Sequence, residues 1–222
     1  MIRDMNEYSR KEAYEQASNI KKHIEAINYL KNSPITPEEF LVNPNLVEDT
    51  RQNALTSLEN ILTPLTHLIH HLNRIEMYDI AHLSGEYATA GMSVAIEGEI
   101  NSSYFKHFKL KTDKSNSDVD MVSEILNRRL KHLQWPKPDL IVLDGGKPQL
   151  NAIIDIPEIK PIFVVALAKK DETLVIPQNN SYIEINLPKN HPGLLLLIRL
   201  RDEAHRFSRS LHHKYKVKSL TK

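Results

Sequence analysis

The stretch PDLIVLDGGK, residues 138 to 147, decides the fold of this chain. Four consecutive apolar residues, 140 to 143, run into Asp144 and are followed by Gly145 and Gly146. A short apolar run bounded by proline and glycine predicts a strand that is buried on both faces. Because burial of a lone carboxylate is costly, we expect Asp144 at the strand's end, where α/β sheets tend to hold ligands and metals. An ordinary Asp-Gly turn is the other interpretation.

The composition is that of a soluble globular protein. The chain has 222 residues, of which 41% are hydrophobic and 26% charged, enough for one sizeable domain with or without an appendage. Its net charge of +1 neither favours nor excludes nucleic acid, and the lack of cysteine excludes disulfides and thiolate metal sites. We find no signal peptide or membrane-spanning stretch, so we expect a cytoplasmic protein without membrane contact.

The first 73 residues are predicted to be helical and contain no glycine. Apolar residues recur every three or four positions from 17 to 27, which predicts an amphipathic helix with a narrow apolar stripe. Prolines end this pattern, and a second helical pattern runs from about 46 to 72, interrupted at Pro64. We therefore expect a helical arm at 1–45 and a helical linker at 46–73, which either pack on the domain or dock to a partner.

Residues 74 to 222 are expected to form one α/β domain that begins with three antiparallel strands. These strands are predicted at 75–80, with Asp79 near the end, at 92–96 after a turn flanked by Gly91, and at 104–110. A helix follows, with Leu133 facing inward and Arg129 outward. The remaining elements are expected to be the strand with Asp144, a helix at 148–154, a strand at 162–167, a hairpin with strands at 174–176 and 182–187, and a helix from 192 to 215.

This order of elements is that of a ribonuclease-H-like fold, a mixed sheet with helices on both faces. The fourth strand then lies parallel beside the first, so that Asp79 and Asp144 project from neighbouring strand ends. In the last helix His205 lies roughly 130° from the centre of the apolar stripe, at the rim of a buried face. A histidine there could point into a cleft beside the sheet.

Two adjacent carboxylates repel each other and raise each other's pKa unless a cation lies between them. A divalent metal removes that repulsion, and hard oxygen ligands suit Mg²⁺ or Mn²⁺. Such a metal can orient a phosphodiester and activate water. His205 would add a nitrogen ligand or serve as a general base.

Three segments resemble the C-terminal endonuclease domain of the UvrC family, the nuclease subunit of bacterial nucleotide excision repair. They are RIEMYDIAHLSG at 74–85, PDLIVLDGGKPQLNA at 138–152 and RDEAHRF at 201–207. The resemblance implies a ribonuclease-H-like fold and a cut in the damaged DNA strand on the 5′ side of the lesion. It also implies that the family's Asp-Asp-His active site falls on Asp79, Asp144 and His205.

Other residues gain candidate roles from the same resemblance. His82, Lys147 and Arg206 are expected to support the site or contact a phosphate, although a turn histidine and solvated basic side chains are the simpler interpretations. A basic surface made of the KHFKLK strand, Arg128 and Arg129, and the tail after Arg199 would contact DNA phosphates.

The N-terminal arm has a counterpart too. Residues 14 to 27 resemble the UVR motif through which UvrC contacts UvrB, with Tyr14, Ala17, Ile20 and Ile24 at matching positions. A plain structural hairpin is the alternative. The GIY-YIG and helix-hairpin-helix domains of UvrC have no counterpart here, so we expect a shortened relative or a fragment.

The sequence thus predicts a metal-dependent DNA endonuclease that nicks damaged double-stranded DNA together with a UvrB-like protein bound through residues 1–45. A UvrC-like module that binds a partner or DNA without cleaving is the alternative. A ribonuclease-H-type nuclease for another branched or hybrid nucleic acid is a third interpretation.

Overall fold

The computed structural model describes residues 2–10, 13, 16, 20, 45–82, 87–111, 118–169, 171–178 and 181–220. The chain divides into two compact units, Met1–Glu48 and Asp49–Lys222. Helix α1 (Ile2–Arg10) belongs to the first unit. Of the four residues expected to contact a UvrB-like protein, Tyr14, Ala17 and Ile24 lie outside the described residues, and only Ile20 is described.

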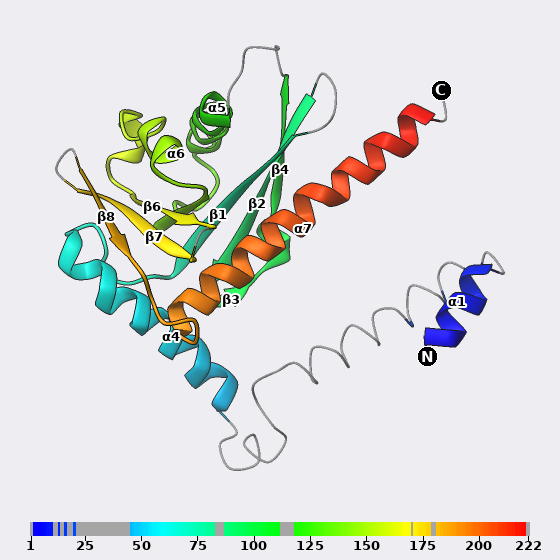
Figure 1. The fold of residues 1–222 in the computed structure, drawn as a ribbon, viewed down its shortest axis with the longest axis horizontal. Helices are drawn as coiled ribbons and strands as arrows, with labels where there is room; N and C mark the ends of the chain where they lie inside the picture. The colour runs from blue at the N-terminus through cyan, green and yellow to red at the C-terminus, as the bar shows by residue number, and fades with distance from the viewer. Residues whose placement is uncertain are drawn as a thin grey trace. The chain divides into compact units, whose positions relative to one another are not determined.

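A mixed sheet of eight strands forms the centre of the second unit's described part (Figure 1). The strands are β1 (Arg74–His82), β2 (Tyr87–Ile96), β3 (Glu99–Ile100), β4 (Lys106–Lys111), β5 (Leu140–Asp144), β6 (Phe163–Ala168), β7 (Thr173–Gln178) and β8 (Ser181–Ile185). Their order is β3-β2-β1-β5-β6-β7-β8, and β4 pairs with β2 beside β3. Strands β1, β5 and β6 are mutually parallel, whereas the other pairs are antiparallel. The predicted mixed sheet, with the first strand beside the DGGK strand, is confirmed.

Helices cover both faces of this sheet (Figure 1). They are α4 (Leu46–Leu62), α5 (Asp118–Leu130), α6 (Lys147–Asn151) and α7 (Pro192–Leu220), with short 3-10 turns at Thr63–Leu65, Ser102–Tyr104 and Pro157–Ile159. One core cluster joins the sheet to α5 and α6, and a second joins it to α4 and α7. Because α4 buries Leu55, Leu58 and Leu62 in the second cluster, the segment expected to be a linker packs on the sheet through its helix.

Strand alternation explains how the two clusters arise. In β5, Ile141 and Leu143 face α5 and α6, whereas Leu140 and Val142 face α4 and α7. Since successive side chains of a strand point to opposite faces, Asp144 follows Leu143 on the α7 side. This is the strand buried on both faces that the apolar run predicts.

Three local expectations were wrong. Gly91 lies inside β2, opposite Asp79, rather than in a turn. Arg129 is 1% exposed, because it reaches back to Glu76 on β1, so it is not part of a surface for DNA. Leu133 is 87% exposed, since α5 already ends at Leu130 and its periodicity no longer applies.

None of the helices in the described part of the chain combines the length and the apolar composition that a membrane span requires.

Candidate active site

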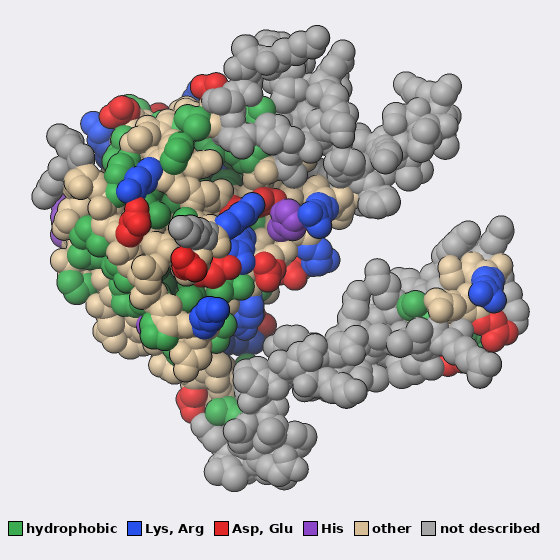
Figure 2. Space-filling view, in the orientation of Figure 1, with side chains coloured by type: hydrophobic (Ala, Val, Ile, Leu, Met, Phe, Trp, Pro, Cys, Tyr) green, Lys and Arg blue, Asp and Glu red, His purple; other side chains and the backbone are tan. Residues whose placement is uncertain are grey.

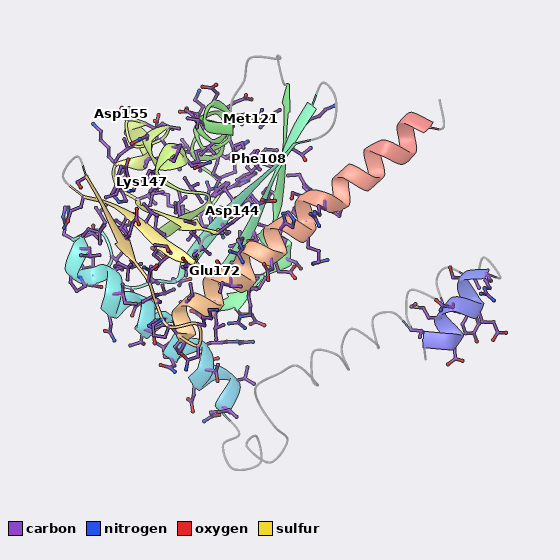
Figure 3. The ribbon with its side chains drawn as sticks, in the orientation of Figure 1. Phe108, Met121, Asp144, Lys147, Asp155 and Glu172 are labelled. Carbon is purple, nitrogen blue, oxygen red and sulfur yellow. The ribbon has the colours of Figure 1, made fainter. Side chains whose placement is uncertain are left out.

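The two aspartates of the predicted site come from neighbouring parallel strands. Asp144 is the last residue of β5, whereas Asp79, which was expected near the end of its strand, lies three residues before the end of β1, because β1 continues to His82 beside β2. Tyr78 of β1 is in register with Leu143 of β5, so Asp79 and Asp144 follow side by side at the same edge of the sheet. Alternation directs both carboxylates toward α7. Both side chains are almost fully buried, that of Asp79 4% exposed and that of Asp144 5% exposed, although Asp144 as a whole residue is half-buried. In Figure 3 Asp144 lies on the α7 side of the sheet, whereas Phe108 lies toward α5 with Met121.

Helix α7 brings His205 to the first of these aspartates. Nδ1 of His205 lies 3.2 Å from Oδ2 of Asp79, and the ring N–H can donate to that oxygen. The side chain of His205 remains 41% exposed, which matches the rim position expected from the helical pattern. The hydroxyl of Ser208, one turn further along α7, donates to the same oxygen at 2.6 Å. The structure therefore brings Asp79, Asp144 and His205 together.

Asp144 has a different environment from Asp79. Its Oδ2 lies 3.3 Å from Nζ of Lys169, an exposed side chain just after β6, and its Oδ1 is buried without a hydrogen-bond partner among the described residues. Burial raises the pKa of the Asp144 carboxyl, Lys169 opposes that rise, and the neighbouring Asp79 adds to it. A cavity of about 280 Å³ lies beside this carboxyl, lined by Ile80, Asp144, Gly145, Gln149, Ala168 and Lys169.

An ion pair fixes the β6–β7 turn against α7 next to the site. Arg201 makes two hydrogen bonds to Glu172, one of them from Nη2 to Oε1 at 3.0 Å. Asp171 and Glu172 have φ values of 59° and 52°, the left-handed region in which non-glycine residues are uncommon. Arg201 lies four residues before His205 on α7. Its ion pair with Glu172 therefore holds the β6–β7 connection, which includes Lys169, against the helix that carries His205. Figure 2 shows acidic, basic and histidine side chains gathered over the middle of α7.

Two of the three residues expected to support the site form ion pairs with other residues. Lys147 pairs with Glu184 of β8 at 2.6 Å, and Arg206 pairs with Glu203 one turn back at 2.6 Å. His82 ends β1, and its side chain is not among those described. Their roles at a phosphate stay predictions.

Sequence reasoning missed Ser208, Lys169 and the partners Arg201 and Glu172. A signal for Ser208 exists, since a residue three positions after His205 lies on the same helical face. Lys169 directly follows the buried strand β6, much as Asp144 is the last residue of the buried strand β5, and it could have been noted for that reason. No local pattern points to Glu172.

The two carboxylates fit a hard divalent cation. Among the described residues, no three His, Asp or Glu side chains already form a ready-made metal site. Asp79 and Asp144 nevertheless present carboxylates from neighbouring strands, just past the last residue pair that joins β1 to β5, and Asp144 keeps one buried oxygen without a partner among the described residues. Oxygen donors of this kind are the preferred ligands of Mg²⁺ and Mn²⁺, and a cation would offset the repulsion between the two acids.

Comparisons with known proteins identify the family to which this chain belongs. The family described as UvrC RNAse H endonuclease domain matches residues 64–208. The UvrABC system protein C of Chlorobium phaeobacteroides is 36% identical over 193 residues, covering 81% of this chain and 29% of that protein. The protein of the same name from Thermotoga maritima is 38% identical over 186 residues, covering 77% of this chain and 32% of that protein. The chain thus spans about three tenths of the length of these relatives.

Among solved structures, endonuclease V of Bacillus subtilis is 13% identical with a TM-score of 0.46, covering 84% of this chain and 96% of that one. Endonuclease V of Ciona intestinalis with inosine-containing DNA is 14% identical with a TM-score of 0.43, covering 65% of this chain and 87% of that one. The family assignment rests on the sequence matches, not on these structures.

Proposed function

The chain belongs to the UvrC RNase H endonuclease domain family, as its three segments predicted, and we propose that it is a metal-dependent DNA endonuclease of nucleotide excision repair. In this proposal it nicks the damaged strand on the 5′ side of the lesion. The observation that carries it is the meeting of Asp79, Asp144 and His205 at one edge of the sheet. Two neighbouring carboxylates repel each other when both are ionised without a cation between them, and perturbed carboxyl groups cluster at functional sites.

Asp79 and Asp144 would hold Mg²⁺ or Mn²⁺ between β1 and the end of β5. A divalent cation bound there would supply the charge that orients a phosphodiester and stabilises the negative charge developing on it. The contact of Nδ1 with Asp79 leaves Nε2 as the nitrogen through which His205 would act, either as a third ligand or in proton transfer. Because the ring is partly exposed, we assign Nε2 to proton transfer to or from the reacting water or the leaving oxygen.

Lys169 would be the group that exchanges partners when substrate binds. Its ammonium lies 3.3 Å from Asp144, yet its side chain is 75% exposed. A cation bound at the two aspartates would compete with this ammonium for Asp144. Released from Asp144, the lysine can turn to a DNA phosphate at the same edge of the sheet.

Damaged double-stranded DNA is the proposed substrate, and a UvrB-like protein the proposed partner. The relatives are named as one component of the UvrABC system. Residues 1–45 are proposed to dock the partner, on the resemblance of residues 14–27 to the UVR motif. Removal of residues 1–45 should abolish capture of a UvrB-like protein in a pull-down while leaving the unfolding of the sheet domain unchanged. Undiminished capture would refute this docking role.

The decisive test is a nicking assay on a duplex with one lesion, with the UvrB-like partner and either Mg²⁺ or Mn²⁺. We expect Asp144→Asn to lower the rate by on the order of 10²–10³-fold, because it removes a charged ligand at the reacting centre. Asp155→Asn is the matched control, since Asp155 is an exposed acid on the α6 side of the sheet (Figure 3). Nicking unchanged by Asp144→Asn would overturn the assignment.

The same assay separates the alternatives. A module that binds without cleaving would hold the lesion duplex in a gel-shift experiment yet leave it intact with either metal. The presence of both acids, with the histidine in contact with Asp79, favours the enzyme, because a silent copy needs none of the three. Faster cleavage of an RNA–DNA hybrid or a branched duplex than of the lesion duplex would indicate the third interpretation.

A further inference from the structure

Ser208 is buried directly behind the candidate active site. It is 0% exposed, and its Oγ lies 2.6 Å from Oδ2 of Asp79, a residue 129 positions earlier in the chain. It lies on α7 three positions after His205, so both side chains approach Asp79 from the same face of the helix.

The single proton of this hydroxyl has two possible acceptors. One is Oδ2 of Asp79 at 2.6 Å, and the other is the backbone carbonyl of His205 at 3.0 Å. A helical serine ordinarily donates back to a carbonyl of the preceding turn. Ser210 does so, with its Oγ 2.7 Å from the carbonyl of Phe207. At Ser208 the shorter distance and the charge of a carboxylate favour donation to Asp79.

Both described hydrogen bonds to this carboxylate fall on one oxygen. His205 and Ser208 each contact Oδ2, which fixes the plane of the carboxyl group and leaves Oδ1 as the oxygen for other partners. Groups that hold a ligating side chain in this manner typically contribute 10–100-fold to metal affinity or activity.

A glycine permits α7 to come close enough for this contact. Gly91 of β2 pairs with Asp79, and a Cβ at position 91 would lie 2.6 Å from the carbonyl oxygen of Ala204 and 3.1 Å from Cβ of Ser208. The backbone of α7 therefore lies almost against that of β2. This close approach places the short side chain of Ser208 within hydrogen-bond distance of β1.

From these contacts we infer that Ser208 is a positioning residue, which orients the Asp79 carboxylate so that it can bind a divalent cation. The inference rests on the proposed metal site and adds a residue that neither touches the cation nor takes part in proton transfer. It differs from a purely structural role because Ser208 acts on metal affinity through Asp79.

Binding of Mn²⁺ to the whole chain tests this inference without nicking. Free Mn²⁺ is measured by electron paramagnetic resonance in titrations of the native protein and of Ser208→Ala, Ser210→Ala and Asp79→Asn. We expect the dissociation constant of Ser208→Ala to rise by roughly tenfold or more. Ser210→Ala loses the ordinary helical serine bond and should bind Mn²⁺ like the native protein.

A double variant separates positioning from general damage to the fold. If Ser208 acts through Asp79, adding Ser208→Ala to Asp79→Asn should change Mn²⁺ affinity no further. Ser208→Cys, which keeps a side chain of similar size with a weaker donor, should show a smaller loss and serves also if the alanine variant does not fold. In nicking assays the Mn²⁺ concentration for half-maximal rate should rise with the same rank, while KM for DNA stays constant.

Each outcome has a definite meaning. Native-like Mn²⁺ affinity in Ser208→Ala, or in Ser208→Cys where the alanine variant does not fold, with Asp79→Asn impaired, overturns the inference and leaves the proposed function standing. Failure of the native protein to bind Mn²⁺ at all overturns both. A loss in Ser208→Ala that persists undiminished in the Asp79→Asn background overturns the positioning role alone.

Discussion

Strand β1 carries two buried acids three residues apart, and they have opposite surroundings. Glu76, 0% exposed, faces α5 and accepts hydrogen bonds from Arg129 at 2.8 Å and 3.0 Å. Arg74 at 2.7 Å and the Tyr78 hydroxyl at 2.6 Å complete its surroundings. Asp79 faces α7, where its neighbour at the next strand end is a second acid, Asp144.

The difference teaches how to distinguish a structural acid from a functional one. At Glu76 two guanidinium groups supply more positive charge than the carboxylate needs, and burial together with Glu76 raises the pKa of Tyr78, so this hydroxyl remains a neutral donor. At the strand ends the negative charge exceeds what the described contacts balance, and Asp144 keeps an oxygen without a partner. The first arrangement stabilises the fold, whereas the second is suited to a cation.

Breaking the ion-pair cluster around Glu76 should have the largest effect on stability. Glu76→Gln leaves two buried arginines without their counter-charge, and removing one partner of a buried ion pair typically costs about 3–5 kcal/mol. Urea unfolding followed by circular dichroism measures this loss. Glu99→Gln is the control, because Glu99 pairs with Arg51 at the surface and should change stability by less than about 1 kcal/mol. Equal losses in both variants would contradict the contrast drawn for β1.

Separating α7 from the sheet should weaken the candidate site without touching its acids. Gly91→Ala places a methyl group 2.6 Å from the Ala204 carbonyl, and overpacking of this kind costs about 1–3 kcal/mol. We expect nicking to fall by up to about 10²-fold, since small displacements of reacting groups are costly. Gly146→Ala is the control, because among the described residues its Cβ would come near Pro148 alone, at 3.9 Å. It should leave the melting temperature unchanged. A native-like melting temperature for Gly91→Ala would show that α7 shifts freely.

For the acid pair we predict a smaller change in the free energy of unfolding, and of the opposite sign: substitution of Asp144 should stabilise the protein. Burial raises the pKa of Asp144 in the folded protein above that of an ordinary carboxyl group in the unfolded chain. The free energy of unfolding should therefore fall as the pH rises from the unfolded pKa through the folded pKa. Above that window and without divalent metal, Asp144→Asn should therefore be more stable than the native protein, and Mn²⁺ should stabilise only the native protein. Unfolding free energies measured between pH 4 and pH 8, with and without Mn²⁺, check the sign. Destabilisation by Asp144→Asn in metal-free neutral buffer would contradict it.

Exposed pairs near the site should matter least. Lys147 and Glu184 contact each other with half-exposed side chains, so Lys147→Gln should change the unfolding free energy by less than about 1 kcal/mol. If Lys147 nevertheless contacts a DNA phosphate, the KM for DNA will rise while stability stays the same. An unchanged KM would leave the lysine as a surface partner of β8.

Much of the fold could be predicted from the sequence because its signals are local. The run of apolar residues before Asp144 predicts β5, and alternation in IEMYDI predicts β1. From the order of elements, the parallel pairing of these strands and the meeting of Asp79 with Asp144 followed. The rim position of His205 could be read from helical periodicity alone.

What was missed depends on contacts between distant parts of the chain. Arg129 looks like a solvent-facing residue in any helical pattern, since periodicity cannot reveal a carboxylate 53 positions earlier that makes its burial favourable. Gly91 resembles a turn glycine until α7 is packed against β2. Ser208 is an ordinary helical serine until Asp79 lies beside it.

The sequence by itself determined which strands form, which strands carry the two aspartates and which helix carries the histidine, because hydrophobic periodicity and strand alternation act over a few residues. Only the tertiary structure decided that Glu76 is neutralised by arginines, whereas Asp79 and Asp144 lie beside each other. That outcome depends on how far each carboxylate lies from guanidinium, hydroxyl and carboxyl groups contributed by other elements. Electrostatic balance in a buried site is set by those distances, and no spacing along the chain encodes them.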